Sequence, residues 1–175
     1  MDWDKLQQEV GEWAERNFGD QAPYRQILGM IEELGELDDA MERRANASPS
    51  PSEFFESAEA VCDAMADTVI YMADFCYRTG RKLSDVANLP KPSAIYRIPT
   101  LIRHLAHHQL KLEQNIRLNE GHNNCITETL ELICALLHWT CRYSLGYTTL
   151  EEEVEKTWAR VQQRDWKKNP ETGEA

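Results

Sequence analysis

ILGMIEELGELDDAM, residues 27–41, repeats its apolar side chains at the spacing of an amphipathic helix. At about 100° per residue these side chains share one face, and Glu32, Glu33 and Glu36 gather roughly opposite it. Carboxylates four positions apart are neighbours on a helix and repel one another unless a cation lies between them. A solvated acidic surface is the commonest use of such glutamates, so this segment alone leaves a surface role and a functional role equally open.

A second segment, VCDAMADTVIYMADFCY at residues 61–77, is almost entirely apolar or small apart from three aspartates. Asp63, Asp67 and Asp74 occupy positions i, i+4 and i+11, which places them on one stripe of a helix. A helix this apolar is buried over most of its surface, and a buried aspartate requires a compensating partner. Because Lys and Arg are absent from 61–77, the partner is either a basic group elsewhere or a metal ion. An oxygen-only ligand set favours Mg²⁺ or Mn²⁺ over zinc, and we favour a metal site over a structural ion-pair network.

Together the two segments resemble the MazG family of all-α nucleoside triphosphate pyrophosphohydrolases, which is related to the dimeric dUTPases. The family pattern is E-E-x-x-E on one helix and an acidic pair, usually E-x-x-D, on the next. Residues 32–36, EELGE, match the first half in full. In the second half Asp67 precedes an apolar run, but Ala64 stands where the glutamate is expected. Asp63 lies one position earlier, and this D-x-x-x-D spacing resembles phage-type members.

The resemblance covers about residues 3–80 and, more weakly, 150–168. It implies an all-α helical bundle that hydrolyses nucleoside or deoxynucleoside triphosphates between the α- and β-phosphates. The products would be a monophosphate and pyrophosphate, as expected of a housecleaning enzyme of the nucleotide pool. The resemblance also implies Mg²⁺ as cofactor, with Mn²⁺ as a substitute, and a homodimeric assembly.

The expected chemistry starts from the charge of the substrate. A triphosphate is a polyanion, which an acidic pocket repels unless bound cations reverse the local field. The expected metal ligands are Glu32, Glu33, Glu36, Asp63 and Asp67. Bound Mg²⁺ would lower the pKa of a water molecule and stabilise the leaving pyrophosphate. Glu32, Glu33 and Glu36 are also the candidate catalytic residues, because a glutamate not committed to metal would orient or deprotonate that water.

Two further features are candidates for substrate binding. Trp13 lies on the apolar side of the first expected helix and could stack on a nucleotide base, although a Trp at this spacing is more often part of the core. Lys156, Arg160 and Arg164 recur at i, i+4 and i+8, so they share one helix face and could contact phosphates. Surface solubility is the simpler interpretation of these three cations.

Composition excludes some classes of function. The chain has 175 residues and a net charge of −11, which argues against binding to nucleic acid, because the phosphate backbone would be repelled. It has no apolar run long enough for a transmembrane helix, so no membrane partner is expected. The start MDWDKLQQEV lacks the pattern of a secretion signal, and five cysteines without a CxxC pair suit reduced thiols. We therefore expect a cytoplasmic protein.

The periodicity predicts helices throughout and no strand. Residues 1–90 are expected to form the catalytic unit with EExxE and DxxxD, and 91–175 a helical unit that completes the same bundle in one compact domain. Because the second unit repeats the order of long helix, turn and apolar helix ending at glycine, we expect a degenerate repeat of the first. GHNN, residues 121–124, is expected to separate its two long helices.

A second class of function stays open, namely a catalytically inactive MazG-like helical module that binds nucleotides or another protein. Ala64 and the degenerate second unit favour this alternative. The retention of all five acids argues against it, because unused carboxylates on apolar helices would only destabilise the fold.

Overall fold

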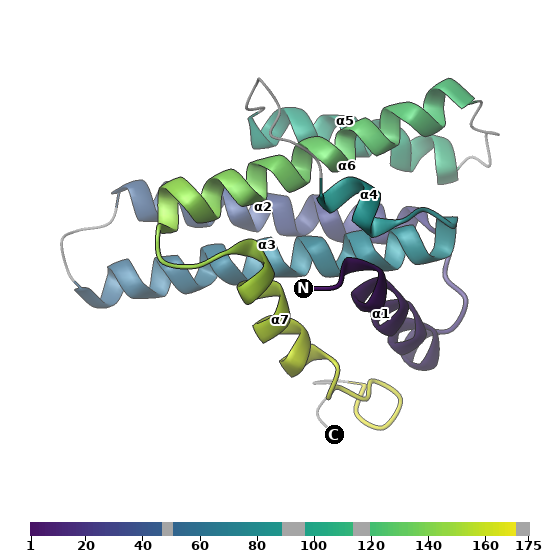
Figure 1. Ribbon diagram of the computed structural model, residues 1–175, viewed down its shortest axis with the longest axis horizontal. Helices are drawn as coiled ribbons and strands as arrows, with labels where there is room; N and C mark the ends of the chain where they lie inside the picture. Colours follow the sequence, from purple (N-terminus) through teal and green to yellow (C-terminus); the bar gives the residue numbers. More distant parts are fainter. Residues whose placement is uncertain (47–50, 89–96, 114–119, 171–175) are drawn as a thin grey trace.

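The computed structural model describes residues 1–46, 51–88, 97–113 and 120–170. Within these parts the chain forms helices joined by short turns and contains no strand, which confirms the all-α class. The helices are α1 (Trp3–Phe18), α2 (Tyr24–Asn46), α3 (Pro51–Thr79), α4 (Leu83–Ala87), α5 (Ile98–Glu113), α6 (Glu120–Thr140), the π-helical turn η1 (Cys141–Leu145) and α7 (Leu150–Val161) (Figure 1).

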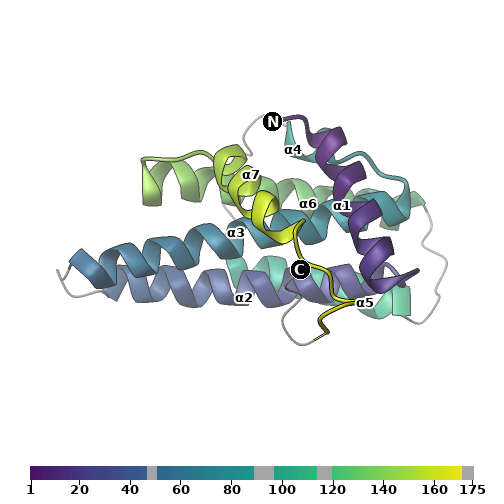
Figure 2. The same cartoon turned by 90° about the horizontal axis from the view of Figure 1, so that it is seen from below.

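The long helices α2 and α3 lie side by side and form the centre of the molecule, as both views show (Figures 1 and 2). The apolar face expected for residues 27–41 is the buried face of α2, where Ile27 and Leu34 have no exposed surface. Val61 and Met65 of α3 belong to the same core and are equally buried. Burying each such side chain contributes about 1.5–3 kcal/mol, so packing between these two helices fixes the position of everything attached to them.

The remaining helices cover the central pair on two sides. In Figure 1, α5 and α6 lie above α2 and α3, whereas α1 and α7 lie below them. α5 packs mainly on α2, α1 and α7 pack on α3, and the short α4 contacts α1 and α6. The helices of the second half therefore pack against the first half. Whether they are a degenerate repeat of it stays a prediction.

Several helix ends follow the sequence signals. The Asp2 side chain accepts a hydrogen bond from the Lys5 amide at the start of α1. Gly19, directly after α1, has a φ of 73°, a left-handed value that favours glycine. Thr149 and Glu152 form a capping box at the start of α7. These signals set the direction in which α1 and α7 meet α3.

The expected break at residues 121–124 is wrong. α6 begins at Glu120, so GHNN lies in its first two turns and continues the helix. Gly and Asn are tolerated near a helix N-terminus, where the first backbone N–H groups need no intrahelical acceptor. The long helix before this segment is α5, which ends at Glu113 in the described part of the chain.

Two glycines allow α1 and α2 to approach α3 closely. A Cβ atom at Gly11 would overlap the ring of Tyr77, and a Cβ atom at Gly29 would overlap the ring of Tyr71. Both tyrosines belong to α3. A larger residue at either position would therefore force the helix away from α3 or displace the ring.

The cysteines are free thiols, and four of the five are buried. Burial raises the pKa of Cys62 to about 11 and that of Cys76 to about 12, so both are protonated at neutral pH. This agrees with the expectation of reduced core thiols. Among the described residues, no helix is long and apolar enough to cross a membrane.

Candidate active site

The five carboxylates expected to form the site lie on the two central helices. α2 carries Glu32, Glu33 and Glu36, and α3 carries Asp63 and Asp67. Glu32 and Glu36 are exposed, whereas Glu33, Asp63 and Asp67 are partly buried. Below, these five residues are called the acid cluster.

Glu33 feels the charge of every other member of the acid cluster. Its pKa is raised from 4.5 to about 8, first by burial and then by the negative charges of Asp67, Glu36, Glu32 and Asp63, in that order. Negative charges that raise the pKa of Glu33 lie close to it in a medium that screens them poorly. The packing of α2 on α3 therefore brings together residues that are 31 positions apart in the chain, from Glu36 to Asp67.

The pKa of Asp67 is also raised by burial and by nearby carboxylates, and two arginines offset part of this rise. Its pKa is raised from 3.8 to about 6 by burial and then by the charge of Asp63. Arg160 and Arg164 lower it, and Glu36 raises it again. The cations on α7 and just after it are thus near enough to Asp67 to offset part of the repulsion, without cancelling it.

One carboxylate of the cluster has a direct cationic partner. Arg160 Nη2 lies 3.0 Å from Asp63 Oδ1, and both side chains are about half exposed, at 55% and 51%. Exposed ion pairs of this kind contribute about 0–1 kcal/mol to stability. The pair therefore contributes little to the stability of α7 on α3. Arg160 loses little free energy when it leaves Asp63 for another anionic partner.

The three cations expected to share one face do not act together. Arg160 and Arg164 lie beside the acid cluster, as the pKa of Asp67 shows. Lys156 instead pairs with Glu153 of its own helix at 3.7 Å and lies near the Cys62 thiol, whose pKa it lowers. The expected shared helix face is wrong for Arg164, because α7 ends at Val161, and phosphate binding by any of the three cations stays a prediction.

The acid cluster has the donor chemistry of a hard divalent cation, because it offers only carboxylate oxygens. In the described parts of the chain, however, no three His, Cys, Asp or Glu side chains are gathered at the spacing of a ligand shell. The carboxylates are therefore close enough to repel one another, but in the described structure they are not gathered as the ligands of one metal ion. Glu32 and Glu36 are exposed, so their side chains are free to change rotamer.

Tyr71 is a neighbour of the acid cluster that the sequence did not single out. Burial, followed by the charges of Glu33 and Glu32, raises the pKa of its phenol. The ring covers Gly29 of α2, and the residue keeps 37% of its surface exposed. Its neutral hydroxyl is thus a potential hydrogen-bond donor at the edge of the cluster. The available signal in the sequence was the position of Tyr71, which lies four residues after Asp67 and therefore close to it on the same helix face.

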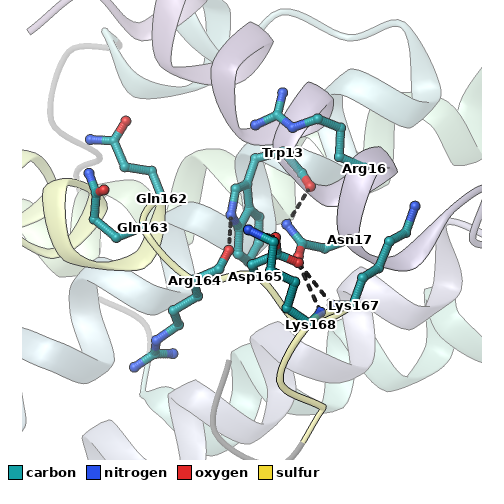
Figure 3. Close-up of a pocket in the computed structure, with 9 residues that line it drawn as sticks. All are labelled: Trp13, Arg16, Asn17, Gln162, Gln163, Arg164, Asp165, Lys167 and Lys168. Carbon is teal, nitrogen blue, oxygen red and sulfur yellow. Dashed lines mark hydrogen bonds and ion pairs between the residues drawn. The ribbon is translucent and has the colours of Figure 1, made fainter. Parts of the chain in front are cut away.

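Trp13 is mostly enclosed by other aromatic residues. Its ring meets Phe18 and Trp158 edge to face, at centroid distances of 5.6 and 5.8 Å, and only 8% of the residue is exposed. The indole N–H donates to the backbone oxygen of Arg164 at 3.1 Å. Trp13 also lines a pocket of about 470 Å³ (Figure 3). Base stacking on Trp13 stays a prediction.

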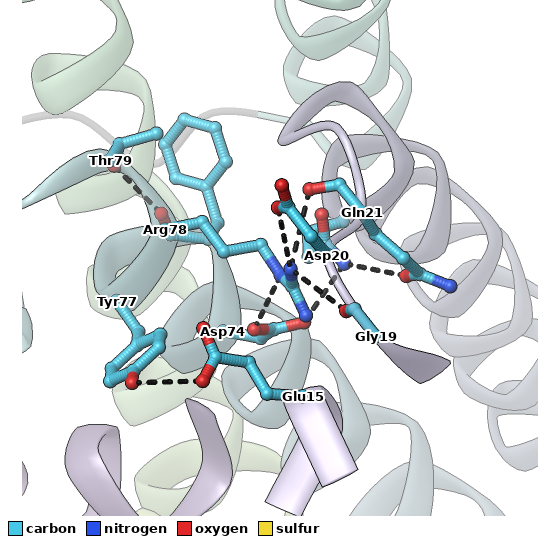
Figure 4. A network of polar contacts seen from close by, with 10 residues as sticks. Glu15, Gly19, Asp20, Gln21, Asp74, Tyr77, Arg78 and Thr79 are labelled. Carbon is cyan, nitrogen blue, oxygen red and sulfur yellow. Dashed lines mark hydrogen bonds and ion pairs between the residues drawn. The ribbon is translucent and has the colours of Figure 1, made fainter. Parts of the chain in front are cut away.

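Asp74, the third aspartate of the stripe, belongs to a structural network at the other end of α3 (Figure 4). Its carboxylate accepts hydrogen bonds from Arg78 Nε and Gln26 Nε2, both at 2.8 Å. Arg78 also donates to the backbone oxygen of Gln21 at 3.3 Å, which ties α3 to the turn before α2. Burial still raises the pKa of Asp74, although both hydrogen bonds lower it. Of the two expected partners, a basic group or a metal ion, Asp74 has the basic group, because Arg78 directly follows the segment 61–77; the favoured metal site is therefore wrong for Asp74.

Comparisons of the chain with protein-family models, with curated proteins and with solved structures each found no match.

Proposed function

We propose that the protein is an Mg²⁺-dependent hydrolase of nucleoside or deoxynucleoside triphosphates that yields a monophosphate and pyrophosphate. The observation that carries this proposal is the position of five carboxylates on the two packed helices α2 and α3, where burial and then the other four charges raise the pKa of Glu33 to about 8. Such crowding destabilises the protein, and a divalent cation bound between the carboxylates would reverse that cost. The resemblance of EELGE and DAMAD to the MazG pattern supplies the reaction.

In this proposal, each group of the site has a distinct task. Glu32, Glu33, Glu36, Asp63 and Asp67 would hold Mg²⁺, with Mn²⁺ as a substitute. When bound, the metal supplies a water of lowered pKa and neutralises charge on the phosphates. A glutamate of EELGE that is not engaged in binding it would orient that water or accept its proton.

The two cations beside the cluster would bind the substrate. Arg160 would exchange its exposed carboxylate partner for a phosphate oxygen, and Arg164 would add a second positive charge on the same side. This exchange costs little, because the existing ion pair is exposed to solvent.

The test is pyrophosphate release from a panel of NTPs and dNTPs with Mg²⁺, by the unmodified chain and by Glu36→Gln. We expect release with some nucleotides and a loss of about 100-fold or more in the variant, as for removal of a group that engages the reacting centre. Glu42→Gln is the matched control, because Glu42 is an exposed glutamate of the same helix. Equal activity in both variants, or no release by folded protein with Mg²⁺ or Mn²⁺, would refute the proposal.

A non-catalytic nucleotide-binding or interaction module is the alternative, and one observation favours it. Asp63, an expected metal ligand, is already paired with Arg160. If that pair persists with nucleotide present, binding would occur without hydrolysis. Isothermal titration with a non-hydrolysable triphosphate, together with absence of pyrophosphate release, would identify this case.

The assembly and location belong to the same proposal. We propose a cytoplasmic homodimer, since the resemblance is to families of dimeric and tetrameric helical proteins. Light scattering coupled to size-exclusion chromatography distinguishes 20.2 kDa for one chain from twice that mass.

A further inference from the structure

A pocket of about 470 Å³ lies between the C-terminal end of α1 and the segment that follows α7 (Figure 3). It is separate from the acid cluster, and of the residues discussed for that cluster only Arg164 also belongs to the pocket. The lining residues are Trp13, Arg16, Asn17, Gln162, Gln163, Arg164, Asp165, Lys167 and Lys168.

The pocket is positive in a strongly negative protein. Four cationic side chains and a single carboxylate line it, whereas the whole chain carries a net charge of −11. Lys168 neutralises the one carboxylate by pairing with Asp165 at 3.3 Å. Within the described residues, Arg16, Arg164 and Lys167 form no ion pair with a carboxylate. In the part of the chain that the structure describes, the pocket therefore presents three cations that no carboxylate pairs with directly.

Hydrogen bonds hold the chain segment that carries these cations. The side-chain oxygen of Asn17 accepts from the Trp166 amide at 2.8 Å, and Trp13 donates to the Arg164 carbonyl at 3.1 Å. Asp165 accepts from the amides of Lys167 and Lys168 at 3.2 and 3.1 Å. The segment is thus fastened to α1 at two points and folded into a turn. This fixes the backbone from which the cations extend, so that less order has to be gained when an anion binds.

Stabilisation of helix C-termini does not account for all of these cations. Arg16 lies in the last turn of α1, where a positive charge is favourable. The effect of a helix dipole falls off within about one turn, whereas Lys167 lies six positions beyond Val161, the last residue of α7. Lys167 and Arg16 come from distant parts of the chain and line the same concavity. A shared anionic ligand explains that convergence.

We propose that this pocket binds a phosphate group of a small molecule without a metal ion. Arg16 and Lys167 would contact its oxygens, with Arg164 between this pocket and the acid cluster. The chemistry differs from that proposed for the acid cluster, where the carboxylates would repel a phosphate unless a bound metal ion offset their charge. Two sources share the ligand chemistry, namely free pyrophosphate and the phosphate of a nucleotide. The inference does not depend on the proposed hydrolysis.

The test is a titration of the whole chain with inorganic pyrophosphate in EDTA at low ionic strength, followed by the tryptophan indole N–H signals in NMR. We expect saturable binding that shifts the signal of Trp13, which lines the pocket. In the double variant Arg16→Ala/Lys167→Ala, we expect affinity to fall about tenfold or more, since both charge-assisted contacts are removed. Both residues are exposed, so the variant is expected to fold, which circular dichroism checks.

The control removes two cations elsewhere. Lys5→Ala/Arg43→Ala changes the net charge equally at exposed positions outside the pocket, and it is expected to leave the affinity within about twofold. An equal loss in both double variants would mean that pyrophosphate responds only to overall charge and would overturn the proposal. Absence of binding in EDTA, or unchanged affinity of Arg16→Ala/Lys167→Ala, would overturn it as well.

Two further titrations separate the source of the ligand and the dependence on the acid cluster. A nucleoside monophosphate that binds more tightly than pyrophosphate identifies a nucleotide phosphate, and the opposite order identifies a free polyphosphate. Glu36→Gln is expected to retain binding in EDTA, whether or not the unmodified chain hydrolyses triphosphates. Loss of binding in Glu36→Gln would overturn the proposal of a separate, metal-independent site.

Discussion

Two aspartates seven positions apart on α3 have opposite surroundings. Asp74 accepts hydrogen bonds from Arg78 and Gln26 and is 6% exposed. Asp67 has two cations nearby, but burial and the other acids still raise its pKa to about 6. The structure thus compensates one end of the stripe internally and leaves the other crowded. Because a protein gains no stability from uncompensated carboxylates, the crowded end is where binding of a cation has the most to offer.

Removal of the cationic partner of Asp74 should have the largest effect on stability. Arg78→Met should lower the free energy of unfolding by about 3–5 kcal/mol, because it leaves a buried carboxylate without its cation and also loses the bond to Gln21. Urea denaturation measures this. Asp74→Asn in the same background should recover part of the loss, since the amide carries no charge. A cost below about 1 kcal/mol for Arg78→Met would show that the network does not compensate Asp74.

The opposite result is expected at the crowded end. Glu33→Gln should raise the free energy of unfolding in EDTA by about 1–2 kcal/mol at pH 9, after allowance for solvent screening, and by little near pH 4.5. Between pH 4.5 and about pH 8 the folded protein holds a proton on Glu33 that the unfolded chain has released. The stability of the unmodified protein therefore falls as the pH rises through this range, and the variant lacks that loss.

Glu42→Gln provides the control for this pH dependence, because it removes an exposed glutamate from the same helix. The difference in free energy of unfolding between Glu42→Gln and the unmodified protein should stay constant from pH 4.5 to pH 9. A Glu33→Gln variant that is less stable than the unmodified protein at pH 9 would mean that the acid cluster does not strain the fold.

Addition of Mg²⁺ should offset the same repulsion among the carboxylates of the acid cluster. At a free concentration ten times its dissociation constant, a single bound ion raises the free energy of unfolding by about 1.4 kcal/mol. Glu36→Gln should lose most of this gain, whereas Glu42→Gln should keep it. Equal gains in all three proteins, reproduced by monovalent salt at matched ionic strength, would indicate screening alone.

The sequence predicted what depends on local pattern. The apolar face of residues 27–41 follows from spacing and residue type alone, and it is the buried face of α2. The acidic residues of α2 and α3 could be named in advance, because the helices on which they lie are strongly periodic.

The features of the site that the sequence did not predict depend mostly on tertiary contacts. Asp63 and Arg160 are 97 positions apart, and nothing in either segment indicates that they meet. Arg78 is an exception, because it lies only four positions after Asp74, directly beyond the segment 61–77 that contains no cation. The cationic pocket joins Arg16 to Lys167, and only the docking of the chain end on α1 brings these two residues together.

The smallest expected effect concerns the exposed ion pair and completes the comparison with Arg78. Arg160→Met should change the free energy of unfolding by less than about 1 kcal/mol, because Arg160 and Asp63 are both about half exposed. If the chain releases pyrophosphate, the same variant should raise KM by about tenfold through loss of a charge-assisted phosphate contact.

A stability loss above about 2 kcal/mol would contradict this picture, because Arg160 would then compensate Asp63 as Arg78 compensates Asp74. The two arginines are chemically the same and both pair with an aspartate of α3. What separates them is burial: Arg78 has 4% of its side chain exposed and Arg160 has 55%. An arginine that stability does not require at the edge of an acidic site is free to bind a ligand, and this freedom is what the variant measures.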